Sequence, residues 1–431
     1  MQKKVLTIAV AGALIAASLA RAQGSGPPTA AVEVYGTINL ALGRVKYSEA
    51  ANGAPGVTKW DVLQSASNYG VRGRDSLGGG LTAWFQIESN APMERSNSIS
   101  ATPASRNSAV GIQGPLGNLF LGQWTTPWAD LDGIWSIGTV GNWGPVASII
   151  GRRGDSGGTA PNPNCDNYQS SGGISLTAIA GIHPPCDAVK GGGGVGHPFW
   201  RRPSQSVVYQ SPVLIGVQFK LLYQTDEGKA TVATSADPSM ISTSLQWAGM
   251  GGRARMGVAL DRHKDFTTVG KSDTGYALKG GYNFGVVDLG LAYENFTYKT
   301  PLSDCKTSNY AVALAIPMGQ GAIRGAYSRA KPITGAYAGV QATVNQTNGS
   351  CGATVTAANQ ADQNGARQYN IGYDHRFSKR TTVGAGYTAI KNDPAANFSW
   401  TSFTPIQDGA SLTPLAGSDV STAFVVITHR F

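Results

Sequence analysis

The chain has 431 residues, of which 57 are glycine, and a formal net charge of +9 at neutral pH. Its mean hydropathy is −0.13, and beyond the first residues it has no apolar run of about 18, which argues against a transmembrane helix. The basic residues are scattered and lack the dense Lys/Arg tract of a nucleic-acid binder, so no nucleic-acid partner is expected.

Residues 1–22 have the pattern of a signal peptide. Lys3 and Lys4 precede an apolar, alanine-rich run, and Ala20-Arg21-Ala22 provides the small residues of a cleavage site. Cleavage there makes Gln23 the first mature residue and leaves 31 basic against 25 acidic residues, a net charge of +6. The alternative is an uncleaved anchor helix, for which the apolar run is short.

Four cysteines follow the signal peptide, and an even count in an exported chain favours disulfides. Three pairings are possible. We favour one bridge within a loop, Cys165–Cys186, and one between neighbouring loops, Cys305–Cys351. The alternative is that one or more thiols stay free. The chain has no C-x-x-C motif and no pair of histidines four residues apart, so we expect neither a metal site nor a cofactor.

Segments in which apolar and polar residues alternate recur from residue 32 to the end. In one of them Leu289, Leu291 and Tyr293 alternate with Gly290 and Ala292, so that one face suits lipid and the other suits water. A β-sandwich would show the same period, but it seldom contains about 16 long strands. The predicted strands are 32–47, 68–75, 81–89, 106–114, 118–124, 204–212, 215–225, 241–248, 253–263, 275–284, 286–298, 308–318, 322–331, 367–377, 381–391 and 420–431.

Short and long connections alternate between these strands. Short turns on one rim and long loops on the other are typical of bacterial outer-membrane barrels. The sequence therefore predicts an all-β fold, a transmembrane antiparallel up-and-down β-barrel of about 16 strands, with residues 23–431 as one barrel domain. The long connections are 48–67, 90–105, 125–203, 226–240, 264–274, 299–307, 332–366 and 392–419.

The third long connection, 125–203, is too long for a simple connector, and loops of that length usually serve a function or are disordered. Its first part is aromatic and acidic and is expected to pack on the rest of the protein. Its second part is rich in glycine and proline and is expected to face solvent. The aromatic and acidic residues at its start are Trp124, Trp128, Asp130, Asp132, Trp135 and Trp143.

Several tracts of the chain resemble one protein family. They are the glycine-rich hairpin Ser67–Ser89, then Arg106–Gly114, Asn118–Asp130, Ser206–Pro212, Gly372–Thr381 and His429–Phe431. Together they resemble the general diffusion porins of Gram-negative outer membranes, in particular the betaproteobacterial branch, over residues 32–431. The resemblance implies a 16-stranded homotrimer in outer-membrane lipid, whose long third external loop folds into the lumen and narrows the channel.

The same resemblance implies a constriction with basic residues on the wall and acidic residues on the loop. By this pattern Arg72 and Arg106 are wall positions and Asp130 is a loop position. Asp132, two residues further along the same loop, is a second acidic candidate. Arg72 and Arg106 are placed mid-strand on the polar face. We expect both to face water, because a lipid-facing arginine near the membrane centre costs about 2–4 kcal/mol. Asn68 and Gln123 stand where the family commonly has arginine, and the candidates that compensate for them are Arg74, Arg152, Arg153, Arg201 and Arg202, of which Arg202 is best aligned.

Catalysis is not expected. The string Gly154-Asp-Ser-Gly-Gly158 copies the nucleophile motif of chymotrypsin-like proteases, but every histidine follows Ser156, whereas that family needs its histidine and aspartate before the serine. We expect a passive, weakly anion-preferring channel for small hydrophilic solutes and ions. The alternatives are a substrate-selective porin with a tryptophan track and, from another class, an outer-membrane adhesin that uses its loops.

The sequence stops within the last predicted strand. Val425, Ile427, His429 and Phe431 fall on one face of that strand. We expect this strand to close the barrel by pairing with 32–47, because an open edge cannot lie in lipid. By resemblance, Phe431 also belongs to the signal that the barrel-assembly machinery reads during insertion.

Overall fold

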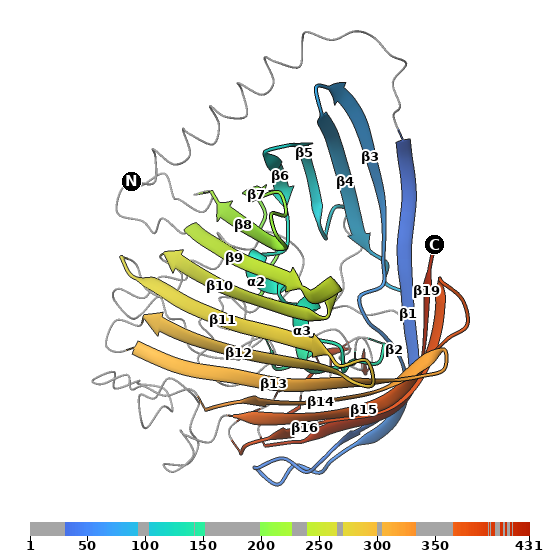
Figure 1. Cartoon of the computed structure of the whole chain (residues 1–431). Coiled ribbons are helices and arrows are strands. Elements are labelled where there is room, and N and C mark those ends of the chain that lie inside the picture. The colour runs from blue at the N-terminus through green and yellow to red at the C-terminus, as the bar shows by residue number, and fades with distance from the viewer. Residues whose placement is uncertain are drawn as a thin grey trace.

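The computed structural model shows long antiparallel strands closed into a barrel (Figure 1). It describes residues 31–93, 103–141, 143–150, 199–225, 239–264, 270–299, 304–332, 365–394, 396, 398–400, 406–407, 410–411, 414–415 and 417–431. Residues 1–22, the predicted signal peptide, lie outside this range. No helix among the described residues is long and apolar enough to cross a membrane.

The strands follow one another around the wall and pair with their sequence neighbours. Their bounds are β1 (Ala31–Tyr47), β2 (Thr58–Gln64), β3 (Asn68–Gly78), β4 (Leu81–Asn90), β5 (Ser108–Gly114), β6 (Gly117–Gln123), β7 (Ser206–Gln210), β8 (Val217–Gln224), β9 (Ser239–Gly249), β10 (Ala254–Lys264), β11 (Ser272–Asn283), β12 (Asp288–Lys299), β13 (Asp304–Met318), β14 (Gly321–Ala330), β15 (Ala366–Arg376), β16 (Thr381–Asn392) and β19 (Val420–Arg430). The small pair β17 (Ile406–Gln407) and β18 (Ala410–Ser411) forms a separate sheet.

The barrel is closed by β19, which pairs antiparallel with both β16 and β1. On its other side β1 pairs with β2 along one half and with β3 along the other half. β2 and β3 therefore act as one barrel strand, and the wall has 16 strands, which confirms the predicted fold. Figure 1 shows β19 and the C-terminus beside β1.

The sequence prediction missed β2, which it placed in the first long connection. β2 is separated from β3 by a kink at Ala66, where φ is +52°. The hydroxyl of Ser67 bridges this kink, because it accepts from the Asn39 N–H at 3.0 Å and donates to the Asn39 carbonyl at 3.2 Å. Outside the kink the strand alternates as expected, with Trp60 and Val62 exposed.

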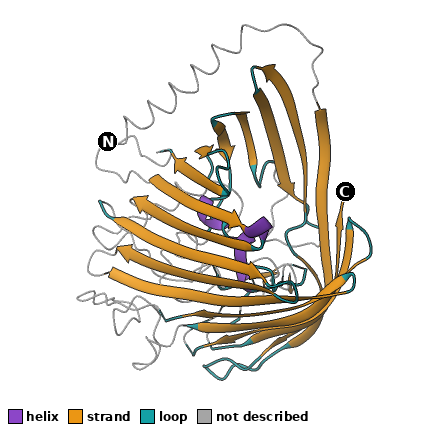
Figure 2. Ribbon diagram, in the orientation of Figure 1, coloured by secondary structure: helices purple, strands orange, loops and turns teal. Residues whose placement is uncertain are grey.

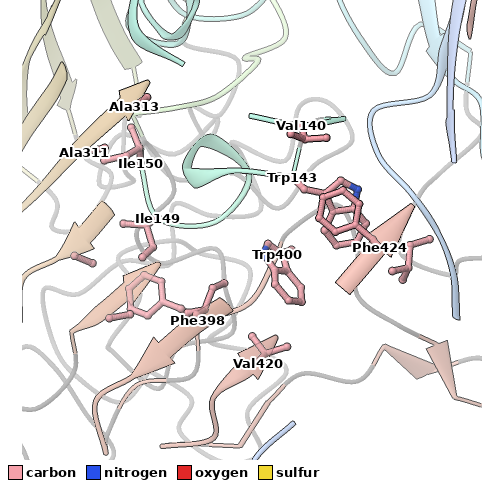
Figure 3. Close-up of a cluster of buried hydrophobic side chains, with 14 of the residues drawn as sticks. Val140, Trp143, Ile149, Ile150, Ala311, Ala313, Phe398, Trp400, Val420 and Phe424 are labelled. Carbon is pink, nitrogen blue, oxygen red and sulfur yellow. The ribbon is translucent and has the colours of Figure 1, made fainter. Parts of the chain in front are cut away.

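The two faces of the wall differ in character. On β10, Met256, Val258 and Leu260 are 40–63% exposed on the outer face, whereas Ala259 on the inner face is 1% exposed. Figure 2 shows that the short helices lie among strands that surround them. The buried apolar residues gather between the inner face and the third loop, as the cluster in Figure 3 shows for Trp143 and Phe424.

Candidate functional site

The described start of the third loop, residues 124–141 and 143–150, contains short helical turns. They are α2 (Pro127–Asp130), α3 (Asp132–Trp135) and the 3-10 turn η2 (Pro145–Ala147). Thr126 caps α2, since its side chain accepts from the Ala129 N–H, and Pro127 occupies the first helical turn, where its missing N–H is not needed. α2 lies against β8–β10, α3 against β10–β12 and η2 against β14, so the loop follows the barrel wall.

Glycines on the inner wall make room for this loop. A Cβ at Gly290 would lie 2.1 Å from the Trp135 carbonyl oxygen, and one at Gly257 would lie 2.6 Å from the Leu131 side chain. A Cβ at Gly384 would lie 2.7 Å from Val140. The loop can approach this closely only because these positions carry no side chain: its backbone approaches β12, and its side chains approach β10 and β16. The alternation around Leu289 had placed Gly290 on the polar face, but its role in seating the loop was not predicted.

A buried ion cluster fixes α3 to the wall. Lys279 Nζ lies 2.6 Å from Asp132 Oδ1 and 3.0 Å from Glu294 Oε1. Asp132 also accepts from Trp200 Nε1 at 2.6 Å, and Trp128 Nε1 donates to Glu294 at 3.1 Å. Lys279 is 1% exposed and Asp132 is 7% exposed. The structure therefore places Asp132 behind the loop, where it anchors the loop rather than bordering water.

Polar wall residues hold the loop backbone at further points. Arg255, paired with Asp288, donates to the Ile134 carbonyl at 3.1 Å. Arg324, paired with Asp374, donates to the Ile137 carbonyl at 2.5 Å. Buried loop carbonyls need such partners. These arginines were not singled out in the sequence; their inner-face parity was the only signal.

The predicted wall arginines lie on the inner face and carry partners. Arg72 Nε lies 2.8 Å from Glu33 Oε2, and its guanidinium lies 4.8 Å from the centroid of the Tyr35 ring. Arg106 Nε lies 2.5 Å from Glu88 Oε1. The Tyr35 hydroxyl donates to the other oxygen of Glu88 at 3.0 Å and so links the two pairs.

The predicted loop acid, Asp130, also has a basic partner. Lys220 Nζ lies 2.8 Å from its Oδ2, and the Thr125 hydroxyl donates to its Oδ1 at 3.4 Å. Burial raises the pKa of the Asp130 carboxyl, and the charge of Lys220 opposes that shift. Arg202 Nε donates to Asn107 Oδ1 at 2.6 Å, while Asn107 Nδ2 donates to Thr125 Oγ1 at 3.1 Å.

These two networks meet at consecutive residues, Arg106 and Asn107. Arg74 lies exposed on the same face of β3 as Arg72. The combined group has five cations, Arg72, Arg74, Arg106, Arg202 and Lys220, against the three carboxylates Glu33, Glu88 and Asp130, a net charge of +2. Because these residues lie where the sequence predicts the constriction, we call this group the constriction cluster. Glu33, Glu88 and Lys220 were not expected from the sequence.

The tryptophans of the loop do not form an exposed track. Trp128, Trp135 and Trp143 are each 0% exposed and pack against the wall. Trp124 instead joins an aromatic cluster on the inner wall, with its ring centroid 4.9 Å from Phe120 and 5.9 Å from Trp84. This cluster is partly exposed at Trp84 and Trp124.

Some predicted positions lie outside the described residues: Arg152, Arg153, Cys165, Cys186 and Cys351. Cys305 lies at the external start of β13, and only its backbone is described. The predicted disulfides therefore stay predictions. Among the described residues, no group of three or more His, Cys, Asp or Glu residues could hold a metal ion.

Comparison with known proteins identifies the family. The model of the Gram-negative porin family matches residues 6–395. The outer membrane porin protein 32 of Delftia acidovorans is 24% identical over 397 residues, which cover 89% of this chain and 90% of the relative. The chain belongs to the Gram-negative porin family. It is thus a channel protein of the outer membrane and not an enzyme.

Solved structures share the fold. An anion-selective porin from Comamonas acidovorans superposes with a TM-score of 0.63 at 20% identity, and the match covers 93% of this chain and all of that one. OmpT of Vibrio cholerae, solved in a trimer form, gives a TM-score of 0.53 at 12% identity and covers 93% of this chain and 99% of that one. Both superpositions show a shared barrel fold.

Proposed function

We propose that this porin conducts small hydrophilic solutes and ions passively and prefers anions weakly, and that the constriction cluster sets this preference. The observation that carries the proposal is the excess of cations in the cluster. Charged rings in a pore select ions of opposite sign. Because Arg72, Arg106 and Lys220 each face a carboxylate, the attraction for anions is small and not that of a strongly basic filter.

The paired charges also create a field across the lumen. Arg106 and Glu88 form a dipole on the wall, and Lys220 and Asp130 form one between the wall and the loop. The field of these pairs orients water and solutes that pass them. The structurally similar porin from Comamonas acidovorans is described as anion-selective, which supports the same sign here. No covalent step, metal or cofactor is required.

Charge substitutions at the cluster test this proposal. R106Q and R202Q should each reduce the anion-to-cation permeability ratio of the purified channel in a planar bilayer. K379Q is the matched control. Lys379 lies exposed in the short turn between β15 and β16, so this substitution removes the same charge far from the cluster. If K379Q changes the ratio as much as R106Q, bulk charge and not the cluster sets selectivity.

We also infer that the protein is a homotrimer. The outer face of strands β3–β6 carries exposed apolar side chains, among them Tyr69, Ile87, Val110 and Leu121, and an apolar face of this kind can pack against a second copy. The trimer form of OmpT supports the stoichiometry. Native mass spectrometry in mild detergent should give three chains per particle, and a monomer there would contradict the inference.

The export features complete the proposal. We propose cleavage after Ala22, disulfides Cys165–Cys186 and Cys305–Cys351, and recognition of Phe431 by the assembly machinery. Amino-terminal sequencing of the purified protein should begin at Gln23, and non-reducing peptide mapping should return both bridges. A start at Met1, or any other cysteine pairing, would contradict the respective part.

A substrate-selective porin is the second candidate, and one observation favours it. The rings of Trp84, Phe120 and Trp124 cluster on the inner wall, and aromatic faces bind planar solutes. A saturable block of the ionic current by an aromatic solute, absent in W84L/W124L, would favour this candidate. A decrease in current that does not saturate with the concentration of the aromatic solute would leave general diffusion as the function.

A further inference from the structure

An exposed arginine stands beside the aromatic cluster of the inner wall. In the register of the sheet Arg74 of β3 lies directly opposite Trp84 of β4, and side chains at such positions have Cβ atoms about 4.5–5.5 Å apart. Both face inward, because Tyr69 and Phe85, which have the opposite parity on the same strands, are exposed on the outer face. Figure 1 shows β3 and β4 side by side. The side chains of Arg74 and Trp84 are therefore neighbours on the lumen side of the wall.

The ring of Trp84 is held in place by its surroundings. Its Nε1 donates to Asn118 Oδ1 at 2.7 Å. In the register Gly111 of β5 separates Trp84 from Phe120, and because Gly111 has no side chain the two rings meet with their centroids 5.1 Å apart. The ring of Trp124 contacts both of them edge-on. The aromatic surface is thus formed before any solute arrives.

Two indoles of this cluster present surface to the lumen. Phe120 is 1% exposed, whereas Trp84 and Trp124 are partly exposed. Their ring centroids are 5.9 Å apart and their planes make an angle of 70°, so a planar ring that stacks on one indole meets the other nearly edge-on. Aromatic pairs prefer these offset and edge-to-face arrangements. The pair of indoles therefore suits a solute with a single aromatic ring.

Arg74 keeps its charge available for a solute. It is exposed, and it forms no salt bridge with any residue that the structure describes. The carboxylate of Glu33, on the neighbouring strand β1, is held instead by Arg72, with 2.8 Å between Nε and Oε2. Glu88 is likewise held by Arg106. The guanidinium of Arg74 can therefore donate to an anion that comes from the lumen.

One guanidinium without a carboxylate partner matches one carboxylate on a solute. Arginine presents its N–H groups as a planar fork that fits both oxygens of a carboxylate. A phosphate dianion would bring a second negative charge. The only other cation of β3 and β4 is Arg72, which is already paired with Glu33. The site therefore favours a singly charged anion.

We propose that Arg74, Trp84 and Trp124 form a binding site for monocyclic aromatic carboxylates, in which the ring stacks on the indoles and the carboxylate accepts from Arg74. This inference rests on the proposed function, because only a solute that enters the lumen reaches the site, and it gives the substrate-selective candidate a chemical class. A single exposed ion pair or a single ring contact contributes little by itself. Aryl carboxylates therefore bind where aliphatic anions and neutral aromatic solutes pass.

Fluorine NMR of the purified full-length protein in dodecyl maltoside tests the proposal, with protein-free micelles as the blank. The probes are 4-fluorobenzoate, trifluoroacetate, which keeps the charge without the ring, and 4-fluorobenzyl alcohol, which keeps the ring without the charge. Wild type should bind 4-fluorobenzoate about tenfold more tightly than either of the others. This comparison needs no substitution, so it decides even where a variant does not assemble.

Two substitutions assign the two halves of the site. R74Q should weaken the binding of 4-fluorobenzoate about tenfold and leave that of 4-fluorobenzyl alcohol unchanged. W84L should weaken the binding of both aromatic probes about threefold and leave that of trifluoroacetate unchanged. The control R376Q removes an exposed arginine at the end of β15, away from β3, and should bind all three probes like wild type.

Three results would overturn the proposal. Equal binding of 4-fluorobenzoate and trifluoroacetate by wild type would mean that the ring is not recognised. Equal weakening by R74Q and R376Q would mean that total charge decides. Tighter binding of phenyl phosphate than of 4-fluorobenzoate would mean that the site takes phosphate.

The binding measurement is independent of conduction, so it separates this inference from the proposed function. A channel that prefers cations in a bilayer yet binds 4-fluorobenzoate as expected would contradict only the proposed function. An anion-preferring channel that binds the three probes equally would contradict only the aromatic carboxylate site.

Discussion

The ring of Phe431 lies over Gly36 and occupies the place that a side chain at position 36 would take. A Cβ at Gly36 would be 2.4 Å from the Phe431 ring carbon Cζ. The two residues also exchange both backbone hydrogen bonds, each with an N···O distance of 3.2 Å. The last residue of the chain is thus bonded to the first barrel strand, which extends the closing ladder to its end.

Deletion of Phe431 should therefore reduce assembly far more than conduction. The variant loses two backbone hydrogen bonds and the ring contact at the rim, while the constriction cluster is untouched. Folded barrel per cell, measured by heat-modifiability on gels, should fall severalfold, and the single-channel conductance of assembled protein should stay the same. A changed conductance at normal yield would show that Phe431 acts on the pore. F431Y, which keeps the ring, is the control.

Replacement of Lys279 by methionine should release the third loop. The change removes the cation that pairs with the buried Asp132, and breaking a buried pair in this way costs about 3–5 kcal/mol. K279M should have a larger and noisier single-channel conductance and lower thermal stability. In K279M/D132N the loop loses both charges of its pair, so part of the stability should return. If the double variant is no better than K279M, the ion pair is not what holds α3.

Substitution of the wall glycines gives a steric test of how closely the third loop packs against the wall. G290A places a methyl group 2.1 Å from the Trp135 carbonyl oxygen, so the loop must shift away from β12. At Gly280 the nearest atom outside its chain neighbours is 3.6 Å from the ideal Cβ, and G280A should behave like wild type. The expected difference is a changed conductance in G290A alone. Identical single-channel currents in G290A and G280A would rule out close packing of the third loop against β12.

Selectivity should depend on pH through Asp130. Burial raises the pKa of this carboxyl, so it takes up a proton at a higher pH than an exposed aspartate does, and the cluster's net charge rises from +2 to +3. Anion preference should therefore grow as the pH falls, and this growth should begin at a higher pH than an exposed aspartate would require. Since the folded state accepts this proton more readily than the unfolded state, protonation favours the folded state. D130N should show the low-pH selectivity already at neutral pH, and an unchanged pH profile in D130N would contradict the assignment.

Much of the fold was predictable because the barrel imposes a period of two on almost every strand. The alternation around Leu289 and Leu291 identified β12, and the short turns separated the hairpins. β2 was missed because Ser65–Ser67 interrupts it, and a short polar break looks like the end of a loop. A kink bridged by a serine hydroxyl has no signal in the pattern of apolar residues.

The site was predictable only in part. Parity and resemblance singled out Arg72, Arg106 and Asp130, whereas their partners Glu33, Glu88 and Lys220 come from other strands and emerge only from the register. Asp132 was grouped with Asp130 because both are acidic and two residues apart. In the structure they belong to different short helices, so one faces Lys220 and the other faces the buried Lys279.

The most direct test of the central claim is the reversal potential of the wild-type channel in a planar bilayer under a potassium chloride gradient. The net charge of the constriction cluster predicts a small displacement from zero toward the chloride equilibrium potential, and this displacement should shrink in R72Q/R106Q/R202Q. A displacement toward the potassium equilibrium potential, or one that the triple variant leaves unchanged, would contradict the account.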